Sequence, residues 1–334
     1  MPSSKWSQSV ISMIREFNKV SSQQYYEFII ANPNLGAKDD HVGLIPHPQI
    51  TSVIKKLDCC SVKNPKIMVS QQSSQKYFRI SDSEKTVRLR YFLPDMCNLY
   101  HDHNSPDASS SAEISKHLNN LANFIKETNP ELIPGWRGEQ YPILYPDSIG
   151  SVERAAASCI FGIEKFGSHL TIYKNLDSDL KILVGKRAAT KSTYPGYYDN
   201  SVAGGINYKT SPLETIKKEA FEEASITDGN ILDKIRSIGT TSHSSSTTYF
   251  TKSRQFNFEL DVTEFEDFEA QPSDGEVEFF KFCSVDEVLE LLGSGQIIPG
   301  SQMLVTLQFL IEKGVLTGEN TEGFGEIVKG LNSY

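Results

Sequence analysis

The sequence predicts an α/β fold, because strand-like runs alternate with segments of helical periodicity over most of the second half of the chain. Runs rich in β-branched and aromatic residues lie at 180–188, 254–262 and 275–285. Apolar residues with helical spacing lie at 211–226, 286–295 and 303–316. This mixture indicates a sheet covered by helices, an α/β sandwich.

The chain has 334 residues, a length typical of two domains. Hydrophobic residues make up 38% and charged residues 22%, enough apolar material for a sizeable core. The first half predicts helices over 6–20 and 112–127 and strands at 76–80 and 87–93. A turn at YPDSIGS separates the halves. We therefore expect an N-terminal α+β accessory domain over 1–148 and a second domain over 149–334.

The charge balance argues against general nucleic-acid binding. Lys and Arg number 33 and Asp and Glu 42, which gives −9, so the average surface repels phosphate backbones. No stretch approaches the roughly 18 consecutive apolar residues of a membrane span, and no signal peptide is visible at the N-terminus. Five cysteines without a C-x-x-C pair indicate reduced thiols. We expect a cytoplasmic protein.

The segment most informative about chemistry is a glutamate-rich helix after a glycine loop, AGGINYKTSPLETIKKEAFEEASI. Pro212 suits an early helical position, and Ser211 or Thr210 suits the N-cap. Glu219 and Glu223 are four residues apart and project together, with Glu222 in the same arc. The opposite side carries an apolar stripe, which we expect to be buried: Leu213, Ile216, Ala220 and Ala224.

Carboxylates crowded on one helix face repel one another, and a divalent cation removes that repulsion. Hard oxygen ligands suit Mg²⁺ or Mn²⁺. Gly204 and Gly205 permit close approach of the backbone to a ligand. A solvated acidic face is the alternative interpretation of the helix taken alone.

The segment resembles the Nudix box, G-x5-E-x7-R-E-U-x-E-E-x-G-U, where U is aliphatic. Gly204, Glu219, Glu222 and Glu223 match the pattern, as do the aliphatic positions at Ala220 and Ile226. The departures from the pattern stand at three supporting positions: Thr210 for Glu, Lys218 for Arg and Ser225 for Gly. The resemblance implies a Nudix α/β/α sandwich over the second domain.

The flanking segments are similar to one branch of the Nudix superfamily. WRGEQYPIL, GKRAATKSTYPGYYDNSVAGGI and DGEVEFFKF resemble fungal and plant enzymes related to the Nudix part of thiamine pyrophosphokinase fusion proteins. This resemblance implies hydrolysis of thiamine diphosphate, and preferentially of its damaged oxo and oxy analogues, to monophosphates. It places the chain in thiamine metabolism and metabolite damage control.

The resemblance also implies roles for particular residues. The expected metal ligands are Glu219, Glu222 and Glu223 with the backbone carbonyl of Ala203. We expect Glu276 to supply the acidic residue of a later loop, with Asp274 and Glu278 as rivals for that role. The expected catalytic set is Glu219, Glu222, Glu223 and Glu276, acting with Mg²⁺ or Mn²⁺ on a water that attacks a diphosphate.

The expected substrate-binding residues fall into two chemical kinds besides the loop glycines Gly204 and Gly205. Basic side chains just before the loop can meet the diphosphate: Lys186, Arg187 and Lys191. Tyr194 and Tyr197 can stack on a heteroaromatic ring. Trp136 is interpreted as an anchor between domains, and His101 and His103 as solvated loop residues.

Other interpretations remain open. The substrate can be another diphosphate, such as ADP-ribose, a nucleoside triphosphate or capped RNA, and Thr210, Lys218 and Ser225 keep open a Nudix-like binding or regulatory module. Isopentenyl diphosphate isomerase shares the fold, but its catalytic Cys and metal-binding His have no counterpart in DNSVAGGI. The partner we expect is a small-molecule diphosphate. The oligomeric state is left open, with a homodimer among the options.

Overall fold

The computed structural model describes residues 2–18, 25–31, 39–46, 78–81, 86–89, 107–176, 179–191, 193–245 and 251–333. The chain divides into two compact units. The first comprises Met1–Lys19, Phe166–Ser245 and Ser253–Tyr334, and the second Val20–Lys165 with Ser246–Lys252. This division differs from the boundary expected at 148/149: the second unit extends to Lys165, and the N-terminal segment is part of the first.

Among the described residues, the first unit is built on a seven-stranded sheet with the order β11-β12-β7-β8-β13, in which β10 also pairs with β7 and β9 with β8. β7 and β8 form an antiparallel hairpin, and β13 and β10 are antiparallel to their partners. The strands are β7 (Lys165–Leu176), β8 (Asp179–Arg187), β9 (Tyr198–Asp199), β10 (Val202–Gly205), β11 (Arg236–Ser245), β12 (Thr251–Asp261) and β13 (Val277–Ser284). The strands predicted at 180–188, 254–262 and 275–285 are confirmed as β8, β12 and β13.

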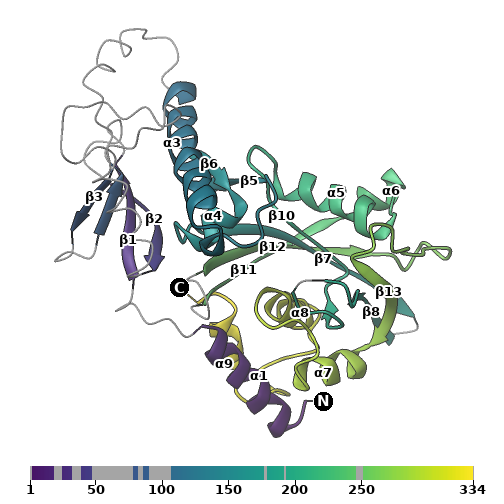
Figure 1. Ribbon diagram of the computed structural model, residues 1–334. Coiled ribbons are helices and arrows are strands. Elements are labelled where there is room, and N and C mark those ends of the chain that lie inside the picture. Colours follow the sequence, from purple (N-terminus) through teal and green to yellow (C-terminus); the bar gives the residue numbers. More distant parts are fainter. Residues whose placement is uncertain are drawn as a thin grey trace, which may run out of the picture. The chain divides into compact units, whose positions relative to one another are not determined.

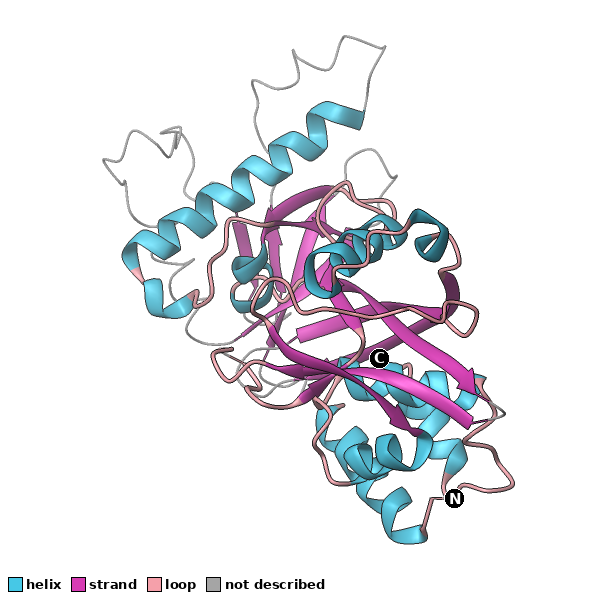
Figure 2. Cartoon of the chain, turned by 90° about the vertical axis from the view of Figure 1, so that its right-hand side faces the viewer, coloured by secondary structure: helices cyan, strands magenta, loops and turns pink. Residues whose placement is uncertain are grey.

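Helices cover both faces of this sheet (Figures 1 and 2). Side chains of β8 alternate between the faces, so that Ile182 and Val184 join the core cluster of α8 while Leu183 joins that of α5. The arrangement is the α/β/α sandwich that was predicted. The helices are α1 (Ser4–Phe17), α5 (Pro212–Ala224), α6 (Gly229–Leu232), α7 (Val285–Gly293), α8 (Ser301–Glu312) and α9 (Phe324–Gly330).

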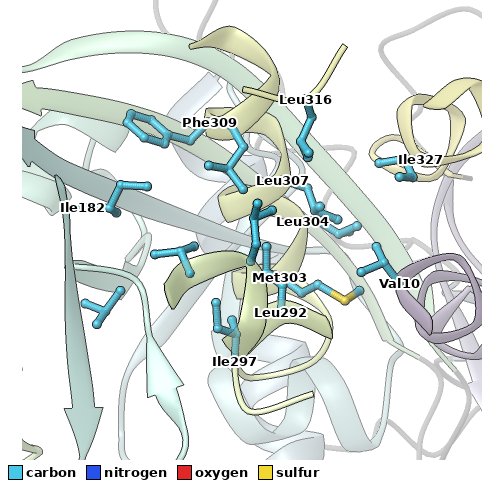
Figure 3. Close-up of a cluster of buried hydrophobic side chains, with 14 of the residues drawn as sticks. Val10, Ile182, Leu292, Ile297, Met303, Leu304, Leu307, Phe309, Leu316 and Ile327 are labelled. Atoms are coloured by element: carbon cyan, nitrogen blue, oxygen red, sulfur yellow. The ribbon is translucent and has the colours of Figure 1, made fainter. Parts of the chain in front are cut away.

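The larger core of the first unit lies between the sheet and the C-terminal helices (Figure 3). Phe309 and Leu304 of α8 are fully or almost fully buried against Ile182. Val10 of α1 belongs to the same cluster, with 0% exposure. The N-terminal helix therefore contributes to the core of the unit that carries the sheet.

Polar contacts also fix α1 in this unit. The Trp6 indole Nε1 donates to the Leu289 carbonyl at 2.7 Å, and the Ser9 hydroxyl donates to the Gly293 carbonyl at 2.9 Å. Ile14 packs over Gly330 of α9, where a β-carbon would lie 3.5 Å from its Cδ1. The residues that bond to α1 thus lie more than 270 positions away in sequence.

The second unit holds a four-stranded sheet with the order β2-β1-β4-β3 and a two-stranded sheet of β5 and β6. Its elements are β1 (Tyr25–Ala31), β2 (Asp39–Pro46), β3 (Phe78–Ser81), β4 (Thr86–Leu89), α3 (Asp107–Thr128), the 3₁₀ helix Pro130–Leu132, β5 (Gln140–Ile143), β6 (Gly150–Glu153) and α4 (Arg154–Cys159). The strands predicted at 76–80 and 87–93 and the helix predicted over 112–127 are confirmed in type.

Two side chains of the second unit, Glu153 and Trp136, make contacts that organise this unit internally. Glu153 is buried and accepts hydrogen bonds from the backbone amides of Arg137, Gly138, Ala155 and Ala156, so its carboxylate organises the start of α4. Trp136 packs on the unit's own core cluster, with the Lys126 ammonium 4.1 Å from its ring centroid. These contacts lie within the second unit, whereas the sequence interpretation made Trp136 an anchor between domains.

No helix in the described part of the chain has the length and apolar character needed to cross a membrane. Cys159 and Cys283 are buried and belong to no disulfide. His101 and His103, interpreted as solvated, lie outside the described residues, as do the remaining cysteines.

Candidate active site

The glutamate helix α5 begins as its sequence predicts. Ser211 is the N-cap, and its hydroxyl accepts from the Glu214 amide while the Glu214 carboxylate accepts from the Ser211 amide. Pro212 occupies the first turn, where its missing N–H costs nothing. The prediction for Leu213 is wrong: this side chain is 40% exposed, and Thr215 is buried in the first turn instead. The capping arrangement fixes the rotation of the helix and hence the direction of its glutamates.

Glu219 lies directly against the glycine loop. β10 runs antiparallel to β7, with Gly204 opposite Ser168, and this pairing brings the Gly204 backbone under α5. A β-carbon on Gly204 would lie 2.5 Å from Cδ and 2.6 Å from Oε1 of Glu219. Only glycine allows this approach. Burial raises the pKa of the Glu219 carboxyl, an effect that Lys218 partly opposes.

Glu223 is the most perturbed carboxyl of the site. Burial raises its pKa to about 9, and the nearby carboxylates of Asp199, Glu219 and Asp274 act in the same direction. The Ala203 amide donates a hydrogen bond to its Oε2 at 3.2 Å, which opposes the shift. A buried carboxyl among other carboxyls retains its proton unless a cation is present to compensate the charge.

Glu223, Asp274 and Glu276 form a group that can hold a metal ion. Each offers a carboxylate oxygen, and these three ligand atoms lie within 4.8 Å of one another. The set consists of hard oxygen donors, and a divalent cation among them would offset the burial that suppresses ionisation of Glu223. The residues present therefore fit Mg²⁺ or Mn²⁺. We call Glu223, Asp274 and Glu276 the carboxylate cage.

The loop that carries two members of the carboxylate cage is bonded to the end of α5. The Gln271 amide donates to the Ala224 carbonyl at 3.0 Å, and the Ser225 hydroxyl donates to the Gln271 carbonyl at 3.1 Å. The hydroxyl of Ser273 also donates to the carbonyl of Glu222. These bonds bring Asp274 and Glu276 beside Glu223 although they lie some 50 residues later.

The other predicted metal ligands are placed differently. Glu222 is exposed, and its carboxylate pairs with the Lys218 ammonium at 2.5 Å. The same ammonium lies 3.5 Å from Glu219. Glu278, a rival of Glu276, is exposed and outside the carboxylate cage, whereas Asp274, the other rival, belongs to it. The structure thus groups Glu223 with the later loop and Glu219 with Gly204, while Lys218 links Glu219 and Glu222.

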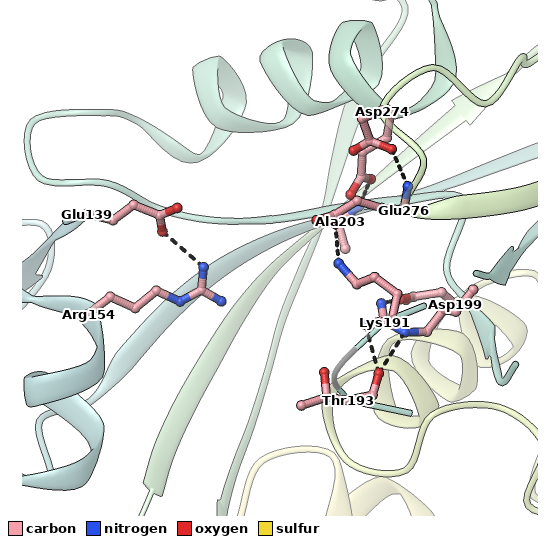
Figure 4. A network of polar contacts seen from close by, with 10 residues as sticks. Glu139, Arg154, Lys191, Thr193, Asp199, Ala203, Asp274 and Glu276 are labelled. Atoms are coloured by element: carbon pink, nitrogen blue, oxygen red, sulfur yellow. Dashed lines mark hydrogen bonds and ion pairs between the residues drawn. The ribbon is translucent and has the colours of Figure 1, made fainter. Parts of the chain in front are cut away.

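The basic residues predicted to meet phosphate lie in β8 or in the segment between β8 and β9, where Figure 4 shows Lys191. The Arg187 guanidinium bonds to Asp199 at 2.9 Å and to the Thr193 carbonyl at 3.1 Å. The Lys191 ammonium pairs with Glu276 at 2.5 Å. The Lys186 ammonium lies 4.2 Å from the ring centroid of Tyr198. Lys191 is thus brought to the carboxylate cage itself, whereas Arg187 holds the segment in place.

The aromatic residues of the same segment form an exposed pair. The rings of Tyr194 and Tyr197 lie 5.4 Å apart at 68°, an edge-to-face contact. They are 40% and 37% exposed, unusually open for large aromatic side chains. Tyr194 and Gly196 both have positive φ, of 48° and 74°, so a tight turn presents the two rings. The pair is available to stack on a planar group.

The comparisons with known proteins identify the family. The sequence profile of the NUDIX domain matches residues 168–299. Uncharacterized protein YJR142W of Saccharomyces cerevisiae is 32% identical over 235 residues, covering 65% of this chain and 68% of that protein. The chain belongs to the Nudix hydrolase family. This family comprises hydrolases of phosphoric anhydrides, and the match assigns the chain to that class.

Two plant relatives carry the Nudix hydrolase name. Nudix hydrolase 24, chloroplastic, of Arabidopsis thaliana is 33% identical over 196 residues, covering 58% of this chain and 53% of the relative. Nudix hydrolase 20, chloroplastic, of the same plant is 34% identical over 194 residues, covering 57% and 51%. The chain spans about half the length of these two proteins.

Solved Nudix structures are more distant. The NUDIX domain of Shewanella oneidensis NrtR complexed with ADP ribose is 14% identical and covers 47% of this chain and 91% of its own, with a TM-score of 0.36. DR0079 from Deinococcus radiodurans is 16% identical, covers 51% and 96%, and has a TM-score of 0.40.

The three departures from the Nudix box have structural explanations in this Nudix domain. Ser225 has φ 56°, the left-handed conformation that favours the family's glycine, and its hydroxyl bonds to the later loop. Lys218 keeps a cation beside Glu219 and Glu222. Thr210 bonds to the Asn207 carbonyl and ends the glycine loop just before the N-cap. The loop–helix–loop geometry is therefore maintained without the family's usual residues.

A buried polar network that the sequence did not indicate is centred on His169, whose register partner in β10 is Ala203. His169 of β7 contacts Asn200 Oδ1 through Nδ1 at 2.8 Å and Gln255 Oε1 through Nε2 at 3.1 Å. Burial lowers the His169 pKa, although Asp199 and the two amides oppose the shift. Asn200 and Gln255 donate in turn to α8, to Thr306 and Ser301. The signal available in sequence was the alternation of the polar residues Gln255 and Asn257 with Phe256 and Phe258 along β12.

Proposed function

We propose that this chain is a Mg²⁺- or Mn²⁺-dependent diphosphatase that acts on thiamine diphosphate, with preference for its oxidised oxo and oxy analogues, and releases the monophosphate. The observation that carries the proposal is the carboxylate cage beside the Gly204–Glu219 contact. The flanking segments that resemble the thiamine-related branch supply the substrate class. An exposed tyrosine pair on the neighbouring segment suits a heteroaromatic ring.

The reaction is the attack of water on a diphosphate linkage. A bound Mg²⁺ would polarise the phosphoryl oxygens and lower the pKa of a bound water. Glu223, Asp274 and Glu276 would hold the cation, and Glu219 would remain beside it against Gly204. Glu276, half exposed on its loop, is also within reach of solvent and can accept a proton from the attacking water. Gly204 and Gly205 leave the backbone of β10 open to the phosphates.

The organic part of the substrate is assigned to the segment between β8 and β9. Tyr194 and Tyr197 would stack on the ring system, while Arg187 holds the segment through the Thr193 carbonyl. This division of roles predicts that the rings affect KM more than kcat. The cytoplasmic location stays a prediction, and the two plant relatives are chloroplastic by name.

The substrate is tested by comparing kcat/KM for oxothiamine diphosphate, thiamine diphosphate and ADP-ribose with Mg²⁺ present. We expect kcat/KM to be highest for oxothiamine diphosphate, lower for thiamine diphosphate and lowest for ADP-ribose. A clear preference for ADP-ribose would move the chain to the other substrate class, and no turnover of any diphosphate would favour a binding module.

The metal assignment is tested with Glu223→Gln, which preserves the size of the side chain and the acceptor for the Ala203 amide. Activity should fall by at least about a hundredfold, with the circular dichroism spectrum unchanged. Glu312→Gln is the matched control, because Glu312 is an exposed carboxylate at the end of α8. Equal activity of the two variants would remove Glu223 from the metal site.

A further inference from the structure

The cationic side chains that surround the candidate site are committed to protein partners. Arg187 is bonded to Asp199 and Thr193, and Lys218 to Glu222 and Glu219. Lys191 is paired with Glu276. A diphosphate carries several negative charges and requires cations in addition to a metal. Binding of a diphosphate is therefore expected to draw one of these cationic groups away from its carboxylate.

Lys191 is the side chain for which a change of partner is easiest to explain. Its side chain is only 14% exposed, and its ammonium lies 2.5 Å from Glu276, a member of the carboxylate cage (Figure 4). It neutralises one of three crowded carboxylates. A divalent cation held by Glu276 neutralises the same carboxylate and repels the ammonium, so the reason for the Lys191–Glu276 pair disappears.

The backbone beside Lys191 allows the side chain to move alone. The Ala188 amide donates to the Glu276 carbonyl at 2.9 Å, and the Lys191 amide donates to the Ala188 carbonyl at 3.1 Å. Arg187 holds the Thr193 carbonyl on the other side of Lys191. With the main chain fixed at both points, rotation of the flexible lysine stem is enough to redirect the ammonium.

We propose that Lys191 exchanges partners: it pairs with Glu276 in the metal-free protein and with the substrate diphosphate once Glu276 engages a divalent cation. This inference rests on the proposed function, because it assumes a metal at the carboxylate cage. Lys191 stays paired in both states, so no desolvated charge is left without a partner. Metal binding and diphosphate binding are consequently coupled through one side chain.

The exchange predicts effects of opposite sign for one substitution. Lys191→Met removes the ammonium but keeps an unbranched side chain. Mn²⁺ then no longer has to displace an ammonium from the Glu276 carboxylate. Mn²⁺ affinity without substrate should rise about threefold or more. Affinity for methylene diphosphonate, a non-hydrolysable diphosphate, should fall about tenfold or more at saturating Mn²⁺. A lysine that only positions Glu276 would instead weaken Mn²⁺ binding when removed.

The measurement is the electron paramagnetic resonance signal of free Mn²⁺ titrated with the full chain, followed by calorimetry with methylene diphosphonate. Lys181→Met is the charge-matched control, because Lys181 pairs with Asp179 at the opposite end of β8. Repeating Lys191→Met in a Glu276→Gln background completes a double-mutant cycle. In that background the substitution should leave Mn²⁺ affinity unchanged, since the competing pair no longer exists.

The possible outcomes separate this inference from the proposed function. Tighter Mn²⁺ binding together with weaker diphosphonate binding supports the exchange. If the wild-type chain binds Mn²⁺ but Lys191→Met binds it equally or less well, the exchange is overturned while the metal site stands. Unchanged diphosphonate affinity overturns the exchange as well. If neither protein binds Mn²⁺, both the exchange and the metal site are rejected.

Discussion

The Glu219 carboxylate lies in the space that a β-carbon on Gly204 would fill, with Oε1 2.6 Å from that position. The contact joins a strand and a helix that the sequence separates by a turn and a capping box. It explains why a glycine is needed in a strand, where this residue ordinarily weakens the structure. Burial in this contact raises the Glu219 pKa, which a neighbouring cation would reverse.

Gly204→Ala is therefore expected to displace Glu219 and to reduce kcat/KM on the preferred diphosphate by about a hundredfold, since small misplacements of catalytic groups have effects of that size. Because the displaced Glu219 carboxylate lies beside the proposed metal site, Mn²⁺ affinity should also weaken in this variant. Gly325→Ala serves as the control, because a β-carbon there meets nothing within 4 Å. Full activity in Gly204→Ala would show that Glu219 can move without consequence.

The stability of the metal-free protein should depend on pH through Glu223. Its folded pKa is about 9, above the ordinary value of 4.5. The folded state therefore keeps a proton that the unfolded chain releases. The stability that this retained proton provides is complete below the unfolded pKa of Glu223. It is lost as pH rises towards 9, and the free energy of unfolding falls by up to about 1.4 kcal/mol per pH unit.

Glu223→Gln cannot ionise, so its unfolding free energy in EDTA should not show this loss. Urea denaturation of both proteins between about pH 6 and about pH 8.5 measures the difference in slope. Saturating Mg²⁺ should flatten the wild-type curve, because the cation favours the ionised carboxylate. Parallel curves in EDTA would mean that Glu223 is not desolvated as the structure indicates.

His169 should produce a pH dependence of the opposite sign. Burial lowers its folded pKa below the ordinary value of 6.5, so the unfolded chain binds a proton more readily. Its contribution to stability is therefore complete above the unfolded pKa and is lost as pH falls below that value through the lower folded pKa. His169→Gln removes this titration and also disturbs contacts with Asn200 and Gln255.

His169→Gln should consequently be less stable than wild type near pH 7.5 by about 1–3 kcal/mol, the cost of disturbing buried hydrogen bonds. The difference should shrink towards pH 5.5, where the wild type pays for a buried neutral imidazole. Chemical denaturation at the two pH values provides the comparison. A difference that stays constant with pH would show that the ring does not titrate in the unfolding equilibrium.

Local signals in the sequence predicted much of the candidate site. Ser211 and Pro212 determine where α5 begins, and the spacing of Glu219 and Glu223 follows from helical geometry. The glycine loop was recognisable because two adjacent glycines precede a capped helix. Glu276 was expected from a resemblance, and the structure brings it to the carboxylate cage. These features depend on neighbours within about one turn or on a known pattern.

Features that depend on long-range packing could not be predicted in the same way. Leu213 has helical spacing with buried residues, but it lies in the first turn of α5 and its side chain is 40% exposed. Lys218 differs from the family's residue, yet its position between Glu219 and Glu222 emerges only from the fold. The polar network of His169 and Gln255 requires the alignment of separate strands with α8. A single sequence gives no register between distant strands.

The N-terminal helix offers a test of the division into units. Ile14 is 4% exposed in the core of the first unit, and α1 packs on α7 and α9. Ile14→Ala should therefore destabilise the first unit, which carries the Nudix sheet, by about 2–5 kcal/mol. The loss comes from the apolar surface no longer buried and from the cavity left over Gly330. If the Nudix domain instead began at residue 149, Ile14→Ala would leave its stability unchanged. Ser12→Ala, on the exposed side of the same helix, should change stability by less than about 0.5 kcal/mol.

Fluorescence can report this unit alone. The chain has 2 tryptophans, and Trp136→Phe leaves Trp6, whose indole bonds to the Leu289 carbonyl. In that background, the urea midpoint of Trp6 fluorescence should fall with Ile14→Ala and stay in place with Ser12→Ala. Nudix activity measured along the same titration should be lost together with the Trp6 signal, because α1 and the carboxylate cage belong to one folded unit. Activity that persists after the Trp6 transition would show that the N-terminal helix detaches without unfolding the sheet.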